Sequence, residues 1–169
     1  MKRELTLTDI AGYLPYGLYC WYGETIKPAL MIGITDYRTP IFEVGRKPIL
    51  RPMSDLYVEI TERGYNDGKP FVPILKLANL LGSPALYQWI LNSDGCCAFS
   101  PEAMDYFRWL GVERSFLHSP SYRDDYPGYV ICNQHEMYDL LHRLHFDYRG
   151  LIPAELAVSV HDLKQNPYE

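Results

Sequence analysis

Three ionisable side chains near the C-terminus have a spacing that could suit a metal. His135, Asp139 and His142 stand at positions i, i+4 and i+7, which places them on one face of a helix. Two imidazoles and a carboxylate arranged in this way can bind a divalent cation. The spacing differs from the H-E-x-x-H pattern of zinc hydrolases, and the face lies opposite an apolar stripe, so water should cover it. We therefore predict that these residues hold no metal, and we expect no other cofactor.

A second group, His145-Phe146-Asp147, follows where that helix should end. A histidine beside a carboxylate can act as an acid–base pair. A protonated histidine at a helix C-terminus is also stabilised by the helix dipole, and such residues can hydrogen-bond to the last carbonyl groups. We favour the capping role, and we keep His145 and Asp147 as candidate binding residues.

The sequence lacks the usual signatures of nucleophilic catalysis and of phosphate binding. It contains no G-x-S-x-G, no G-x-G-x-x-G and no G-x-x-x-x-G-K-[ST] string, so neither a nucleophile elbow nor a phosphate loop is indicated. The four cysteines include no C-x-x-C pair, and Cys97 has no evident base to activate it. We predict four reduced thiols and favour a protein that is not an enzyme.

The elements that would position these residues predict a single α+β domain over residues 1–169. Residues 7–14 have the spacing of one short helix, capped by Thr6 or Thr8. An N-terminal β-rich region should follow, and we expect its strands to form an antiparallel meander because they are close in the sequence. Its expected strands are 18–22, 29–35, 41–44 and 49–50.

A mainly helical region is expected next. Pro73 should open a helix that Gly82 closes, and Ser83 should start another that runs to about residue 91. A third should run from Ser100 to Gly111 with an apolar face, and the last from 133 to 145. Strands are expected at 129–132 and 156–160. The apolar residues of the last two helices are Ala103, Met104, Phe107 and Leu110, and Met137, Leu140, Leu141 and Leu144.

Composition and charge narrow the range of partners. The net charge is −5 and the chain has no basic block, so we expect no nucleic-acid binding. No stretch reaches the roughly 18 apolar residues that cross a bilayer, and we predict a cytoplasmic protein without membrane contact. Tyrosine is abundant, with 15 residues, and is enriched at protein interfaces. One of them, Tyr122, lies in the long aperiodic stretch 115–128, which is a candidate binding loop.

Several strings together resemble a family of small uncharacterised proteins from gut anaerobes and their phages or prophages. The most distinctive is K-P-I-L-R-P-M-S-D-L at 47–56. L-P-Y-G-L at 14–18, F-V-P-I at 71–74, H-F-D at 145–147 and G-L-I at 150–152 resemble other strings of that family. The resemblance implies a phage-related or mobile-element setting, and it implies no activity.

Two charged residues in the string at 47–56 could have either a structural role or a binding role. Arg51 and Asp55 are close enough in sequence to pair, and a framed polar pair can fix the register of a fold. Pro48 and Pro52 would frame the extended segment before a cap at Ser54. The alternative is that Arg51 and Asp55 line a ligand or partner site, which makes them candidate binding residues. We favour the structural role.

These observations support three hypotheses for function. The leading one is a non-enzymatic binding protein of phage or mobile-element origin whose partner is another protein. The alternative is a small hydrolase or metal-dependent enzyme that uses His135, His142 or His145. The third, a nucleic-acid mimic, would require the carboxylates of residues 52–169 to lie along one face.

Overall fold

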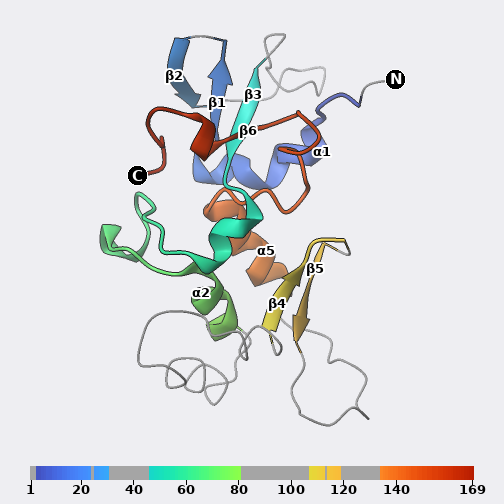
Figure 1. Cartoon of the computed structure of the whole chain (residues 1–169), viewed down its shortest axis with the longest axis vertical. Helices are drawn as coiled ribbons and strands as arrows, with labels where there is room; N and C mark the ends of the chain where they lie inside the picture. Colours follow the sequence, from blue (N-terminus) through green and yellow to red (C-terminus); the bar gives the residue numbers. More distant parts are fainter. Residues whose placement is uncertain (1–2, 24, 31–45, 81–106, 113, 119–133) are drawn as a thin grey trace. The chain divides into compact units, whose positions relative to one another are not determined.

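A computed structural model describes residues 3–23, 25–30, 46–80, 107–112, 114–118 and 134–169 (Figure 1). The chain divides into two compact units, Met1–Met53 with Asp139–Glu169, and Ser54–Tyr138. Each unit contains strands and helical turns, so the α+β class holds. The prediction of one domain over 1–169 stays a prediction.

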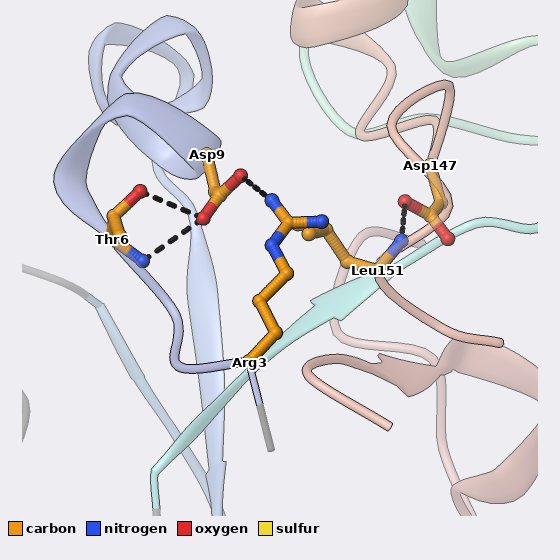
Figure 2. A network of polar contacts seen from close by, with 5 residues as sticks. All are labelled: Arg3, Thr6, Asp9, Asp147 and Leu151. Atoms are coloured by element: carbon orange, nitrogen blue, oxygen red, sulfur yellow. Dashed lines mark hydrogen bonds and ion pairs between the residues drawn. The ribbon is translucent and has the colours of Figure 1, made fainter. Parts of the chain in front are cut away.

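The first unit begins with a short helix that is held by its own capping residues. Helix α1 (Leu7–Ile10) starts after the N-cap Thr6 and passes into the 3₁₀ helix η1 (Ala11–Tyr16). The Asp9 carboxylate accepts hydrogen bonds from the backbone N–H of Thr6 at 2.9 Å and from its hydroxyl at 2.8 Å, and it pairs with Arg3 (Figure 2). Burial opposes ionisation of Asp9, but these contacts outweigh it and hold the pKa of Asp9 below its ordinary value. Of the two expected caps, Thr6 is the one used.

The first unit also contains a four-stranded sheet with the strand order β2-β1-β3-β6. Strand β1 (Tyr19–Tyr22) pairs antiparallel with β2 (Thr25–Leu30) and with β3 (Lys47–Leu50). The expected antiparallel pairing of the early strands is therefore confirmed for these three. Strand β6 (Val158–Ser159) lies parallel to β3, so the sheet is mixed. A meander prediction misses this pairing because β6 joins from the far end of the sequence.

Among the residues that the structure describes, two hydrophobic clusters stabilise the first unit. The larger joins the N-terminal helices to β3 and to the chain after residue 150. The smaller lies around Ile49, Val160 and Tyr168. Removing this apolar area from water supplies the main driving force for folding. The buried members of the larger cluster are Ile10, Tyr13, Leu18, Leu50, Leu151 and Ala157.

The described residues of the second unit form turns, a helix and a hairpin. The 3₁₀ helix η2 (Met53–Tyr57) leads to a bridge in which Ile60 and Phe71 exchange backbone hydrogen bonds at 2.9 and 3.0 Å. The turn η3 (Asn66–Gly68) lies between them, as the sequence predicts for residues 64–68. Helix α2 (Pro73–Leu80) begins at its proline as expected, while its predicted end at Gly82 lies outside the described residues.

One expected helix is wrong where the structure describes it. Strand β4 (Phe107–Leu110) replaces the last part of the helix predicted for 100–111, and it pairs antiparallel with β5 (Ser115–His118). The stretch 115–128 therefore begins with a strand. Periodicity in a short apolar window does not separate helix from strand. The rings of Trp109 and Phe116 meet across the hairpin, with centroids 4.9 Å apart, and such cross-strand pairs stabilise a sheet.

Helix α5 (Gln134–Arg143) matches the predicted last helix closely. Its predicted stripe, Met137, Leu140, Leu141 and Leu144, is buried throughout. None of the described helices combines the length and the apolarity needed to cross a bilayer. The other predicted elements, helix 83–91 and the strands at 41–44 and 129–132, lie outside the described residues.

Candidate functional site

The C-terminus of α5 ends in a non-glycine residue with positive φ. The N–H of His145 donates to the carbonyl of His142 at 3.1 Å, and the N–H of Phe146 donates to the carbonyl of Leu141 at 2.9 Å. These two bonds form a Schellman motif, in which the residue at the His145 position adopts the left-handed region. His145 has φ +60°. The structure thus places His145 at the capping position through its backbone, whereas the sequence argument rested on its side chain.

A histidine has a steric cost at φ > 0 that glycine does not have. Other contacts of His145 must therefore offset this cost. The His145 side chain is 2 % exposed. Its ring stacks on the ring of Tyr168, with centroids 3.8 Å apart and an interplanar angle of 15°. The stacking and the burial are gains that glycine could not supply. The strained residue therefore marks a specific side-chain contact.

Arg51 joins this turn to the sheet through its backbone. Its N–H donates to the carbonyl of His145 at 2.8 Å, and its carbonyl accepts from the N–H of Asp147, also at 2.8 Å. Arg51 and Phe146 thereby form a parallel bridge. The side chain of Arg51 is buried, and its guanidinium carbon lies 5.8 Å from the centroid of the Tyr168 ring. Two of the motif strings, 47–56 and 145–147, are therefore direct neighbours in space.

Asp147 uses both carboxylate oxygens to hold the following turn. One oxygen accepts from the N–H of Leu151 and the other from the N–H of Ile152, each at 2.7 Å; Figure 2 draws the bond to Leu151. The side chain is 5 % exposed. An ionised carboxylate makes strong hydrogen bonds to backbone N–H groups. The geometry of Asp147 is that of a turn-stabilising residue.

Tyrosines tie the same turn to the N-terminal helices. The hydroxyl of Tyr13 donates to the carbonyl of Phe146 at 2.7 Å, across 133 residues of sequence. Tyr13 is fully buried, and burial raises its pKa. The Tyr13 and His142 rings pack edge to face, with centroids 4.8 Å apart. The Tyr148 hydroxyl lies 2.8 Å from His142 Nε2. Together with the Tyr168 contacts, this is a tyrosine cluster around the end of α5.

The expectation that His142 lies on a solvated face is wrong. Its ring is half-buried between Tyr13, Tyr148 and Gly12, because the turn after α5 folds back over this side of the helix. Asp139 is exposed and accepts from the Tyr16 hydroxyl at 2.6 Å, while His135 is exposed. Within the part of the chain that the structure describes, no three His, Cys, Asp or Glu residues form a group that could hold a metal.

The burial of His142 predicts a pH-dependent stability. Burial lowers the pKa of His142 below 6.5, the positive charge of Arg149 adds to this, and Asp139 opposes it. The unfolded chain then binds a proton at a higher pH than the folded protein does. The stability contribution is therefore complete above pH 6.5 and is lost as the pH falls through the folded pKa.

We expect denaturant unfolding between pH 7.5 and 5 to show this difference. The wild type should lose more stability on acidification than the variant His142→Gln, which has no titrating ring at this position. Parallel curves for the two proteins would contradict the prediction.

The remaining sequence candidates fall in different units or outside the described residues. Asp55 is buried in η2 and belongs to the second unit, whereas Arg51 belongs to the first. The pairing of Arg51 with Asp55 and their role in binding stay predictions. Tyr122, together with Cys96, Cys97 and Cys132, lies outside the described residues. Cys20 is free and buried, and burial raises the pKa of its thiol to about 12.

Sequence reasoning missed Gly12 and Tyr168 as members of the cluster. Neither has a local signal, because the groups they meet lie far away in the sequence. No family model, curated protein or solved structure matches the chain. The resemblance of the motif strings to a phage-related family is therefore neither supported nor opposed by a relative.

Proposed function

We propose that this chain is a non-enzymatic binding protein that recognises another protein through the tip of the β4–β5 hairpin. The observation that carries the proposal is the exposure of Val112, whose side chain is 93 % exposed at that tip. The free energy of binding becomes more favourable when a partner covers a large apolar side chain that was exposed to water. Gly111 and Arg114, beside it, are also exposed.

The hairpin is anchored on both sides of this tip. The N–H of Trp109 donates to the Tyr57 hydroxyl at 3.1 Å, and the Tyr138 hydroxyl donates to the carbonyl of Arg114 at 2.9 Å. Arg114 has φ +49°. A binding segment whose flanking residues are already held in place loses less conformational entropy on binding. This pre-organisation supports a binding role for the tip.

The polar residues of the motif strings give further support. Arg51, His145 and Asp147 are buried, and their backbone or carboxylate groups bond to main-chain groups. These contacts serve the fold. A hydrolase that uses the C-terminal histidines has less support, because His145 is buried and the half-buried ring of His142 packs against Tyr13. The phage or mobile-element setting remains part of the proposal through the resemblance alone.

The test is capture of a partner from lysate of the native host by tagged wild type, Val112→Asp and Val58→Asp. Val58 is a matched control because it is the other large apolar residue with high exposure in the described residues, at 52 %. We expect wild type and Val58→Asp to capture the same protein in stoichiometric amount and Val112→Asp to lose it. Both aspartates are exposed, so stability should change by no more than about 0.5 kcal/mol. Equal capture by all three proteins would disprove the role of the tip.

A further inference from the structure

The ring of Tyr168 occupies a slot whose walls come from three separate parts of the first unit. His145 stacks on the ring, and the Tyr19 ring meets it edge-on with centroids 5.4 Å apart. Arg51 lies near the same ring. The Tyr168 side chain is 2 % exposed. The slot therefore has the flat walls and the neighbouring cation that suit an aromatic ring.

The slot also recognises the phenol hydroxyl. Tyr168 Oη donates to the carbonyl of Ile49 at 2.7 Å, across 119 residues of sequence, and accepts from the N–H of Tyr19 at 3.3 Å. A phenylalanine in this position would leave the buried carbonyl without that donor. A site with such paired groups discriminates strongly between tyrosine and its analogue without the hydroxyl.

The residues that carry Tyr168 into the slot form a separate segment, 164–169, which we call the strap. The strap follows the 3₁₀ helix η4 (Val160–Asp162), at the end of the chain coloured dark red in Figure 1. Lys164, Gln165 and Glu169 are exposed. Asn166 organises the strap locally, since its Oδ1 accepts from the N–H of Tyr168 at 3.1 Å and its Nδ2 donates to Glu169 at 2.9 Å.

We propose that this slot is a binding site for the tyrosine side chain of an extended peptide, and that the strap is an internal ligand which such a peptide can replace. The strap has three exposed and two partly buried residues around one deeply buried anchor, which is how a short peptide binds. Its local turn around Asn166 is formed by adjacent residues, so a free peptide of the same sequence can present its tyrosine in the same way. The partner would be a protein segment with a tyrosine flanked by polar residues.

The direct test uses a variant that ends at Leu163 and a fluorescent peptide of the strap sequence, Lys-Gln-Asn-Pro-Tyr-Glu. Fluorescence anisotropy should show saturable binding to this variant. A peptide with phenylalanine in place of tyrosine should bind about 5- to 10-fold more weakly, because one buried hydrogen bond is lost. A peptide with alanine there should not bind. Intact protein should bind the tyrosine peptide at least about 10-fold more weakly, because the strap competes at a millimolar effective concentration.

Two results would overturn the proposal. One is a truncated protein with the circular dichroism of the wild type that binds no peptide at 1 mM, a concentration comparable to the effective one of the strap. The other is equal binding to truncated and intact protein, which would place the peptide elsewhere.

If the truncated protein does not fold, the full-length variant Tyr168→Gly replaces it. Adding p-cresol, which has the ring and the hydroxyl of a tyrosine side chain, should raise the Tm of that variant more than toluene does, and should not raise the Tm of the wild type. The absence of a difference between p-cresol and toluene would overturn the proposed recognition.

Discussion

Replacing Asp147 with alanine is expected to destabilise the first unit by about 2–5 kcal/mol. The substitution removes both acceptors from the N–H groups of Leu151 and Ile152, which lie 2.7 Å from the carboxylate oxygens. Hydrogen bonds to a charged group contribute about 1.5–3 kcal/mol each, and stranded buried donors add a desolvation penalty. Leu151 is a fully buried member of the larger cluster, so a loosened turn also disturbs the core.

Thermal unfolding measures this effect against two further variants. Asp147→Asn keeps one carbonyl acceptor, but its NH₂ group faces the second N–H donor and the charge is lost, so it should lose most of the same stability. Asp162→Ala is a matched control, because Asp162 is an exposed carboxylate in the same unit, and its loss should stay within about 0.5 kcal/mol. A loss of 1 kcal/mol lowers Tm by about 2–4 °C in a protein of this size.

The same thermal unfolding experiments distinguish a turn-stabilising role of Asp147 from a role in binding a partner. A residue whose carboxylate serves a partner would leave Tm unchanged when it is replaced. An Asp147→Ala protein that melts within about one degree of the wild type would therefore refute the turn-stabilising role. Asp147 would then again be a candidate binding residue.

Replacing Gly12 with alanine is expected to cost about 1–3 kcal/mol by forcing apart the contact with His142. A Cβ atom on Gly12 would overlap Cε1 and Nε2 of the His142 ring. The ring has little room to retreat, because it packs against Tyr13 and bonds with Tyr148. Overpacking of this kind usually costs about 1–3 kcal/mol.

A double-mutant cycle with His142→Ala tests the mechanism. Once the ring is absent, Gly12→Ala should cost nothing and can stabilise by up to about 1 kcal/mol, because alanine restricts the unfolded chain. The expected coupling free energy is therefore at least about 1 kcal/mol. Gly111→Ala serves as the control, since a Cβ there meets no atom within 4 Å. Additive effects of the two substitutions would show that the ring contact is not the cause.

The local secondary-structure features of this protein follow from residues that are close together in its sequence. The leucine stripe of α5, the proline start of α2, a threonine cap for α1 at Thr6 or Thr8 and the turn at 64–68 were all predictable. Each depends on residues within a few positions of one another, through helical periodicity, backbone φ preferences or a single capping bond. The mixed α+β class follows from such elements alone.

The tertiary structure decided how these elements combine into a site. Arg51 meets Phe146, β6 lies parallel to β3, and Tyr168 bonds to Ile49 only because the chain returns to itself over long distances. The hairpin at 107–118 is a related case, since a strand is defined by its partner and the helical spacing of Phe107 and Leu110 could not exclude it. The same holds for His142, whose exposure depends on the turn that covers it. Local patterns contain no information on which distant backbone groups and rings become neighbours, and the tyrosine cluster consists of such neighbours.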